Sequence, residues 1–354
     1  MRSFTYNGLP ARVVFGDGAL GSLAGEIERW GAKSVLVIST PHQKDDGNAL
    51  VAKLSSYGAR LYSNATMHTP VNVTDDAMRL VKEAGVDLLV ALGGGSTIGL
   101  AKAIALRTDL PQIAIPTTYA GSEMTPILGE TRDGLKTTQR SMKILPEVVI
   151  YDVDLTMSLP AGLSGTSGMN AIAHSVEALY AEDNNPIISL MAEESIGALG
   201  RSLPKIAANP QDREARSDAQ YGAFLAGACL GAVGMALHHK LCHTIGGTFD
   251  LPHAETHTIV LPHALAYNAP ATPRAVEAVN RALGSKDAAR GIFDLSGKVG
   301  APRALRDLGM PEEGIDKATD LALANPYWNP RPLERGGIRE LIARAWAGEE
   351  PMAA

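Results

Sequence analysis

The sequence predicts an α/β domain with a parallel sheet in residues 1–158 and an all-helical domain in residues 159–354. In the first 150 residues, short aliphatic runs alternate with helix-like stretches, which is the rhythm of parallel strands joined by crossover helices. After "PEVVIYDVDL" (146–155) the strand signals stop, and the remaining chain has helical patterns. A chain of 354 residues is long enough to bury a core in each domain.

The elements of the first domain follow from its aliphatic runs and turn residues. Strands are expected at 34–39, 59–63, 87–92 and 112–116, and helices at 48–58, 74–85 and 97–107. The helix at 74–85 has the clearest ends, because Thr74 can cap its start and Gly85 can end it.

The second domain is expected to contain two long helices, at 165–182 and 217–247, and smaller helices between 274 and 354. The last of these are interrupted by "ANPYWNPRP" (324–332). The apolar stretch at 224–237 is too short to span a bilayer and is rich in small residues, so we interpret it as part of a buried core helix.

The bulk composition excludes several classes of protein. The formal charge of −6 is spread along the chain without a basic patch, so nucleic acid is not an expected partner. Two cysteines, Cys229 and Cys242, cannot build a disulfide framework. The opening "MRSFTYNGLP" has no apolar signal core, so we expect a cytoplasmic enzyme with no membrane partner.

A glycine turn, "LGGGSTIG", links the strand at 87–92 to the following helix. Such a turn presents free backbone N–H groups at the positive end of a helix, and glycine lets an anion approach closely. Gly93, Gly94, Gly95 and Ser96 are therefore candidates for binding a cofactor phosphate, although a tight turn without a ligand remains an alternative. The spacing matches neither G-x-G-x-x-G nor a P-loop.

Ser39 ends the strand at 34–39, where a site selective for NADH often has an acidic residue. An acid there would repel the 2′-phosphate of NADPH. Ser39 is thus a candidate cofactor contact that permits NADH or NADPH.

Histidines are concentrated in the second domain. Seven of the nine are His174, His238, His239, His243, His253, His257 and His263. A single histidine is more often an ordinary core residue, but a cluster on buried helices favours a site. The "HAETH" segment is not a zincin motif, since Glu255 stands two residues after His253 instead of one.

Taken together, these segments resemble the iron-containing alcohol dehydrogenase superfamily over nearly the whole chain. The matching segments are "VVFGDGAL", "LGGGSTIGLAKAIAL", "IPTTYAGSEMT", "LPEVVIYDVDL", the helix with Asn170 and His174, "LCHTIGG" and "LPHAETHTIVLPHALAYN". The resemblance implies the dehydroquinate synthase-like fold of that superfamily, with a Rossmann-like dinucleotide-binding domain followed by helices.

Members of that superfamily hold a divalent metal with an aspartate, a histidine four residues later and two further histidines. The resemblance places these at Asn170, His174, His243 and His253. Asn170 departs from the pattern, because an amide replaces the site's only carboxylate, and we therefore expect no metal. A second departure is Gly99, which stands where the superfamily's glycine loop continues to an aspartate.

Both departures resemble a branch of the superfamily that reduces the C=C bond of maleylacetate to give 3-oxoadipate in aromatic-compound catabolism. That resemblance implies NADH or NADPH as cofactor, halogenated maleylacetates as further substrates, and a homodimer. We expect His243 and His253 to supply a hydrogen-bond donor and an acid, with His174 and Asn170 orienting them or the substrate.

The remaining site candidates follow from the resemblance and from the charge of a dicarboxylate substrate. Thr117 and Thr118 are expected to contact the cofactor, and Tyr119 and His239 the substrate. Lys240 and Arg331 are candidate partners for the substrate carboxylates, although both are ordinary surface charges by the simpler interpretation.

Three other functions remain open from the sequence. One is a metal-dependent alcohol or hydroxy-acid dehydrogenase that tolerates Asn170. Another is a non-redox lyase of the dehydroquinate synthase type, which shares the two-domain plan. The third is a binding protein that keeps the cofactor fold without catalysis.

Overall fold

The computed structural model describes residues 4–6, 8–9, 11–132 and 134–352. The predicted absence of a signal segment concerns residues 1–10, part of which lies outside this set. The chain divides into two compact units, one of residues 9–159 and one of residues 160–354 together with 1–8. Each unit is described by itself below.

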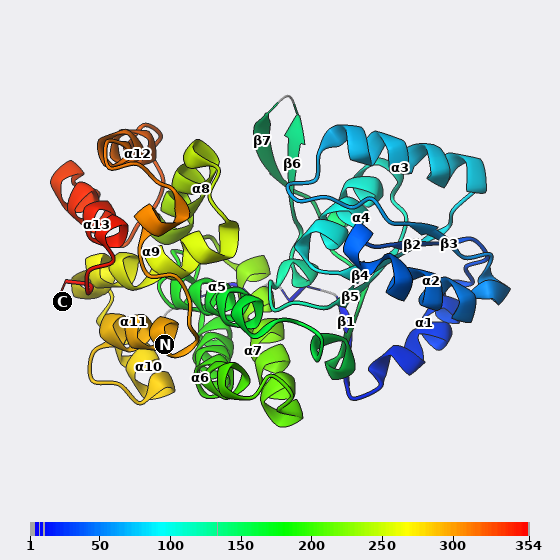
Figure 1. Cartoon of the computed structure of the whole chain (residues 1–354), viewed down its shortest axis with the longest axis horizontal. Helices are drawn as coiled ribbons and strands as arrows, with labels where there is room; N and C mark the ends of the chain where they lie inside the picture. The colour runs from blue at the N-terminus through cyan, green and yellow to red at the C-terminus, as the bar shows by residue number, and fades with distance from the viewer. Residues whose placement is uncertain (1–3, 7, 10, 133, 353–354) are drawn as a thin grey trace. The chain divides into compact units, whose positions relative to one another are not determined.

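The first unit contains a parallel sheet in the order β1-β8-β5-β4-β2-β3 (Figure 1). The strands are β1 (Arg12–Gly16), β2 (Val35–Ile38), β3 (Arg60–Tyr62), β4 (Leu88–Gly93), β5 (Gln112–Pro116) and β8 (Val148–Asp152). Every residue of β2, β4, β5 and β8 is buried, which explains their unbroken apolar runs.

Helices cover both faces of this sheet. They are α1 (Leu23–Trp30), α2 (Lys44–Lys53), α3 (Val71–Ala84) and α4 (Gly95–Thr108). Figure 1 shows α1 and α2 on one side and α3 and α4 on the other. Residues of α1 and α2 share a buried core with alternate residues of β2 and β4, such as Val35, Val37 and Val90.

Two of the expected helices have different limits in the structure. The helix expected at 74–85 begins at Val71, so Thr74 lies inside it and does not cap it. Pro70 immediately precedes the first helical residue, and proline is common at helix starts because its φ is fixed. Pro70 was therefore the better sequence indicator of where this helix begins. The helix expected at 48–58 is α2, followed by a short 3₁₀ turn at Ser55–Tyr57 that ends on Gly58.

Three strands were not expected from the sequence. They are β1 and the antiparallel hairpin of β6 (Ile127–Arg132) and β7 (Leu135–Arg140). β1 lies at the edge of the sheet and is only half-buried, so it lacks a long apolar run. The hairpin carries charged and polar residues, because its strands pair with each other and stay outside the buried sheet.

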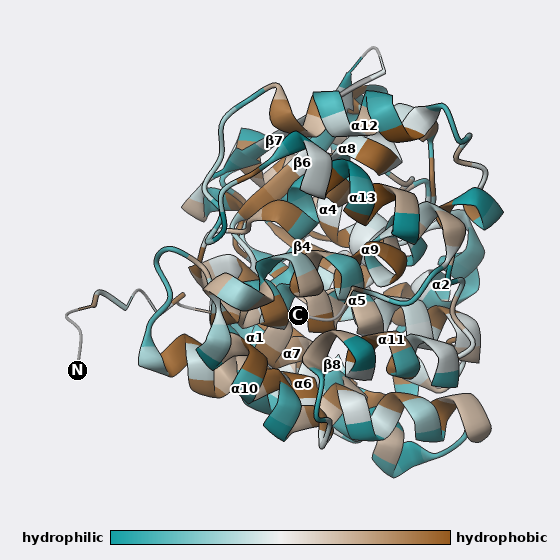
Figure 2. Ribbon diagram, turned by 90° about the vertical axis from the view of Figure 1, so that its left-hand side faces the viewer, coloured by the Kyte–Doolittle hydropathy of each residue, from teal (hydrophilic) through white to brown (hydrophobic). Residues whose placement is uncertain are grey.

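The second unit is formed by helices (Figure 1). They are α5 (Ala161–Leu179), α6 (Pro186–Ala208), α7 (Arg213–Ala232), α8 (Leu237–Phe249), α9 (His253–Asn268), α10 (Pro273–Leu283), α11 (Ala288–Lys298), α12 (Gly314–Leu323) and α13 (Arg335–Ala347). Figure 2 shows hydrophobic and hydrophilic stretches alternating along several of them, including α10. One buried apolar cluster joins α8, α9, α12 and α13, and it includes Leu241, Ile259 and Ile342.

The prediction of one continuous helix at 217–247 is wrong. The chain leaves α7 after Ala232, turns, and starts α8 at Leu237, so that the two helix axes are bent by 95°. Acidic side chains hold the turn. Asp183 accepts a hydrogen bond from the Gly234 N–H at 2.9 Å, and Glu177 accepts one from the Ala236 N–H at 3.0 Å. These side-chain acceptors take the place of the backbone carbonyls that would accept in a continuous helix. Because both acids are distant in the sequence, local sequence patterns do not reveal the bend.

Within the described residues, no single helix has both the length and the apolar composition needed to cross a membrane. α7 and α8 meet that test only when taken together across their bend.

Candidate active site

The glycine turn lies at the carboxyl end of β4, as predicted. Gly93 ends the strand, Gly94 is the N-cap residue of α4, and Gly95 and Ser96 form its first turn. The first N–H groups of a helix have no acceptor within the helix, and the helix dipole is positive there. Gly95 is exposed and Ser96 half-buried, so a phosphate can approach these groups from solvent.

Two of the three glycines are required by close packing. A Cβ atom on Gly93 would lie 2.5 Å from the Thr97 Oγ1, and the backbone there has φ +151°, which side chains disfavour. A Cβ atom on Gly94 would lie 2.9 Å from the Thr118 Cγ2. A Cβ atom on Gly95 would have nothing within 4 Å, so the lack of a side chain there leaves space for a ligand.

The other cofactor candidates end the neighbouring strands. β4 pairs with β5 on one side and β2 on the other, so Thr117 and Ser39 follow strands that flank the glycine turn. Thr117 donates its N–H to the Gly93 carbonyl and accepts a bond from the Gln43 side chain. Ser39 is fully buried, and its hydroxyl donates to the Thr40 carbonyl, so its direct contact with a cofactor stays a prediction. This edge is where open parallel sheets bind ligands.

The loop after β5 is anchored by the buried lysine Lys102 of α4. Its ammonium group donates to the carbonyls of Ser122 (2.5 Å) and Ile127 (3.0 Å), and to the Thr125 hydroxyl (3.0 Å). Burial lowers the pKa of Lys102 to about 7, and the charge of Glu123 acts in the opposite direction. Sequence reasoning gave Lys102 no role, although a lysine inside an apolar helix is a usable signal.

Gly99 and Tyr119 lie in the same unit as the glycine turn. A Cβ atom on Gly99 would lie 2.5 Å from the Thr69 Oγ1, so Thr69 closes the space that a side chain at this position would need. Tyr119 is fully buried in this unit. Its expected contact with substrate therefore remains a prediction.

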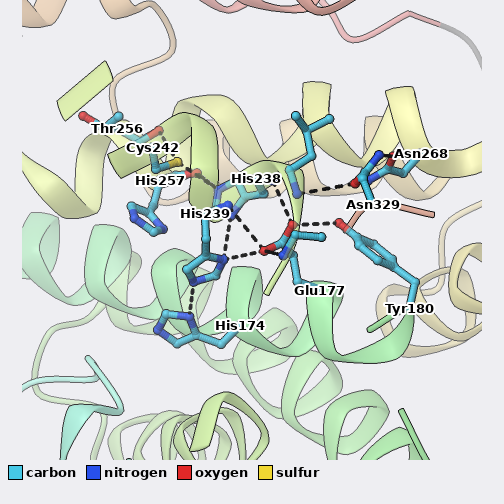
Figure 3. Close-up of polar contacts among 12 residues, drawn as sticks. His174, Glu177, Tyr180, His238, His239, Cys242, Thr256, His257, Asn268 and Asn329 are labelled. Carbon is cyan, nitrogen blue, oxygen red and sulfur yellow. Dashed lines mark hydrogen bonds and ion pairs between the residues drawn. The ribbon is translucent and has the colours of Figure 1, made fainter. Parts of the chain in front are cut away.

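The second unit brings six of the predicted cluster's histidines together. His174 comes from α5, His238, His239 and His243 from α8, and His253 and His257 from α9 (Figure 3 labels His174, His238, His239 and His257). The ring centroids are 5.0 Å apart for His174 and His239, 5.0 Å for His239 and His257, and 4.2 Å for His253 and His257. The His243 centroid is 6.2 Å from that of His239 and 6.1 Å from that of His253.

The cluster has a buried floor and an exposed rim. His174 and His239 are 4% and 6% exposed, and His257 is fully buried, whereas His243 and His253 are exposed. Burial lowers the pKa of His239 and of His257 well below the usual histidine value, so both rings are neutral at pH 7. A small molecule can therefore reach His243 and His253 first.

Hydrogen bonds define how the floor is ordered. The His239 Nδ1 lies 2.6 Å from the Glu177 Oε2, and its Nε2 lies 2.9 Å from the His174 Nδ1. Figure 3 shows this chain running from Glu177 through His239 to His174. The ring that lies against the His174 Nδ1 is thus His239, a residue expected to hold substrate.

His238 and His257 complete the floor. The His238 Nε2 donates to the His257 backbone carbonyl at 3.0 Å, and burial lowers the pKa of His238 to about 4. Neither ring nitrogen of His257 has a partner among the described residues. An unpaired buried imidazole is costly, and it commonly marks a place where a ligand or water binds.

Asn170 lies on α5 one turn before His174. Its side chain is 4% exposed, and its Oδ1 has no hydrogen-bond partner among the described residues. The amide oxygen is thus available for a ligand, as expected for a site residue. It carries no formal charge.

Most nitrogens of the buried imidazoles that could hold a divalent ion already take part in hydrogen bonds. Ring nitrogens of His238, His239 and His257 lie within 4.8 Å of one another. However, both nitrogens of His239 and the Nε2 of His238 are engaged in hydrogen bonds. The amide of Asn170 is a neutral group, so it adds no negative charge that would strengthen metal binding beside the imidazoles.

The two candidate cations for substrate binding lie elsewhere in the helical unit. Arg331 donates to the Tyr267 carbonyl at 2.7 Å and stacks on the Tyr267 ring at 4.3 Å. Lys240 lies half-buried on α8, 5.7 Å from the centre of the Tyr327 ring. Neither contact includes a histidine of the cluster, so their role with substrate stays a prediction.

The sequence analysis missed one member of the site, Glu177, and it placed His257 in the histidine cluster without giving it a role. Glu177 is seven residues after Asn170 and three after His174, which places all three on one face of α5. His257 is four residues after His253 on α9. Both spacings were visible in the sequence, but a glutamate near a helix end is usually a surface residue.

Comparison with known proteins agrees with this architecture. The family model "Iron-containing alcohol dehydrogenase" matches residues 10–153, and "Fe-containing alcohol dehydrogenase family, C-terminal" matches residues 164–346. The chain belongs to the iron-containing alcohol dehydrogenase family. This assignment replaces the lyase alternative.

Within the iron-containing alcohol dehydrogenase family, several relatives match over nearly their full length. Maleylacetate reductase of Sphingobium indicum is 56% identical, with 99% of each chain covered. The crystal structure of maleylacetate reductase from Rhizobium sp. strain MTP-10005 is 54% identical, covers 99% of this chain and 100% of its own, and has a TM-score of 0.96. An iron-containing alcohol dehydrogenase from Corynebacterium glutamicum is 43% identical, with 99% of each chain covered and a TM-score of 0.95.

Proposed function

We propose that this protein is a maleylacetate reductase, which uses NADH or NADPH to reduce the C=C bond of maleylacetate to 3-oxoadipate in aromatic-compound catabolism. The observation that carries the proposal is a histidine cluster, in which the buried rings of His239 and His257 are neutral, together with an amide, Asn170, in place of a carboxylate. The full-length identity of 46–56% to proteins named maleylacetate reductase supports the same substrate.

The chemistry of the substrate explains why such a site suffices. The alkene of maleylacetate is conjugated to a ketone, so hydride can add to the alkene carbon remote from the ketone. The electron pair of the broken π bond then moves to the former ketone oxygen and gives an enolate. Positioned hydrogen-bond donors stabilise an enolate oxygen without a Lewis acid. Proton transfer to the carbon beside the former ketone completes the reduction.

The exposed rim supplies the donor and the acid in this proposal. His243 and His253 are the exposed rings of the cluster, so they are the ones that can contact substrate directly. The buried rings of His174 and His239 hold the floor in place, and the free Oδ1 of Asn170 can accept a hydrogen bond from the substrate or from a bound water. NADH or NADPH supplies the hydride when bound, with the glycine turn and Thr117–Thr118 as its phosphate-binding edge.

The decisive experiment follows NADH oxidation by its absorbance, with maleylacetate as substrate and protein that has been treated with a chelator and dialysed. Undiminished turnover is the expected result. Activity that is lost and returns only with Fe²⁺ or Zn²⁺ would instead favour a metal-dependent dehydrogenase that tolerates Asn170. A halogenated maleylacetate tested in parallel should consume NADH and release halide.

The cellular setting follows from the family resemblance. We propose a cytoplasmic homodimer whose partner molecules are the dicarboxylate substrate and the nicotinamide cofactor. Size-exclusion chromatography with light scattering of the full chain measures the assembly, and a mass of one chain would refute the dimer.

A further inference from the structure

Glu177 is a carboxylate buried beneath the histidine cluster, and it joins two structural elements. It lies near the end of α5 and is fully buried. Its two oxygens accept hydrogen bonds from the backbone N–H groups of Ala236 (3.0 Å), His238 (2.8 Å) and His239 (3.3 Å). These three groups form the start of α8, so the carboxylate serves as the cap for that helix.

The same carboxylate contacts a side chain of the cluster. Its Oε2 lies 2.6 Å from the His239 Nδ1, which is the length of a charge-assisted bond. Burial raises the pKa of Glu177, while the charge of His238 and the backbone donors lower it. Three backbone N–H groups donate to the two oxygens, and because such donors stabilise the ionised form of a carboxylate, we assign that form to Glu177.

An ionised Glu177 fixes the proton on His239. The Nδ1 of His239 must be the donor, so the Nε2 of this neutral ring carries the lone pair. That lone pair lies 2.9 Å from the His174 Nδ1, which must then donate. When His174 is neutral, its Nε2 is then the lone-pair nitrogen. One buried carboxylate thereby sets the tautomer of two successive rings.

We propose that Glu177 is a positioning residue that fixes the tautomers of His239 and His174 for catalysis. This inference rests on the proposed function in one respect, which is that the kinetic test uses maleylacetate as the substrate. Glu177 acts through the two rings and not by touching substrate. Loss of its charge lets His239 and His174 exchange between tautomers, so a fraction of molecules presents the wrong nitrogen to the site.

The test is Glu177→Gln in the full chain. A glutamine keeps the size of the side chain and one acceptor oxygen, but its NH₂ group cannot accept a hydrogen bond. It therefore cannot accept from the backbone N–H groups and from the His239 Nδ1 as the two carboxylate oxygens do. Misplacing a catalytic group by about 1 Å can lower the rate by about 100-fold. We expect kcat with maleylacetate to fall by that factor, while the KM for NADH stays within about twofold.

Asp183→Asn is the matched control. Asp183 is an exposed acid that accepts from the Gly234 N–H in the same turn before α8, and it makes no contact with a histidine of the cluster. If Glu177 were only a helix cap, both variants would lower the melting temperature and neither would lower kcat selectively. That outcome would overturn the proposal.

A spectroscopic readout works without any substrate. In protein labelled with ¹⁵N-histidine, with assignments from His239→Gln and His174→Gln, the native enzyme should show a protonated Nδ1 and an unprotonated Nε2 for both rings. Glu177→Gln should give averaged or reversed ring-nitrogen shifts at unchanged circular dichroism. Unchanged shifts would refute the proposal. Correct shifts with no maleylacetate turnover in the native enzyme would refute the proposed function alone.

Discussion

Asn170 lies one helical turn before His174 on α5, and its neutral amide oxygen has no partner among the described residues. Replacing it by a carboxylate adds one negative charge next to imidazole nitrogens, which is the combination that divalent transition metals prefer. We therefore expect Asn170→Asp to bind Zn²⁺ at least about tenfold more tightly than the native protein, because second-sphere and ligand changes of this size alter metal affinity by 10-fold or more. Isothermal titration with Zn²⁺ measures this.

Asn185→Asp is the control for that substitution. Asn185 is also buried, but it caps the start of α6, where its Oδ1 accepts from the N–H groups of Ile187 and Ile188. The same added charge at this position should leave Zn²⁺ affinity unchanged. Equal affinity in Asn170→Asp and the native protein would show that Asn170 does not decide the metal chemistry.

His263 allows a pH prediction that is separate from catalysis. It is 3% exposed, neither ring nitrogen has a partner among the described residues, and burial lowers its pKa to about 4. The unfolded chain takes up a proton near pH 6.5 and the folded chain only near pH 4. The free energy of unfolding therefore falls as pH drops from 6.5 to 4, by about 1.4 kcal/mol per pH unit for this group. His263→Phe should remove that part of the slope.

Denaturant unfolding of the native protein and His263→Phe at pH 7 and pH 5 measures the difference. At pH 7 the variant should be no less stable, because the histidine makes no hydrogen bond to a described residue and Phe fits beside Phe293, whose ring centroid is 6.4 Å away. His42→Phe, at an exposed position, is the control. An identical pH slope in native protein and His263→Phe would contradict the prediction.

At the scale of elements, Lys102 links α4 to the loop that follows β5. It donates to two backbone carbonyls and a hydroxyl of that loop, which also carries Thr117 and Thr118. Lys102→Met keeps the aliphatic stem but removes the ammonium donor from the Ile127 carbonyl and the Thr125 hydroxyl, whereas the Ser122 carbonyl still accepts from Thr125. A buried group left without a donor costs about 1–3 kcal/mol. We expect a lower melting temperature and a weaker NADH affinity. Each 1.4 kcal/mol lost from the free energy of NADH binding raises the Kd about tenfold.

Differential scanning fluorimetry and a fluorescence titration with NADH measure the two effects. Lys53→Met, in the last turn of α2, removes the same charge from an exposed position and should change neither. Native NADH affinity in Lys102→Met would mean that the loop keeps its conformation without the buried lysine.

Some of the helices and strands could be predicted from the sequence, and others could not. The buried strands β2, β4, β5 and β8 were predictable, because residues buried on both faces form unbroken aliphatic runs. The bend between α7 and α8 was not, because Glu177 and Asp183 hold it from more than 50 residues away. For the same reason, the histidine set was predictable from its spacing, but the buried carboxylate that orders it was not.

At the scale of the whole molecule, the candidate site residues are divided between two compact units. The glycine turn and Thr117 belong to the unit of residues 9–159, and the histidines belong to the unit of residues 160–354. A ligand stabilises the groups that it contacts, by about 2.7 kcal/mol at a concentration 100 times its Kd. Cofactor and substrate should therefore protect different parts of the chain from hydrogen exchange.

We expect NADH alone to protect the first turn of α4 and the segment 117–125 from hydrogen exchange. A non-reducible dicarboxylate analogue added with NADH should extend the protection to α8 and α9.

Gly94→Ala should lose the protection by NADH, because the added Cβ would lie 2.9 Å from the Thr118 Cγ2 and close the turn to phosphate. Gly21→Ala, where a Cβ meets nothing within 4 Å, should retain it. Exchange measured by mass spectrometry on the full chain distinguishes the patterns. Protection of α8 and α9 by NADH in Gly94→Ala would contradict a cofactor site at the glycine turn.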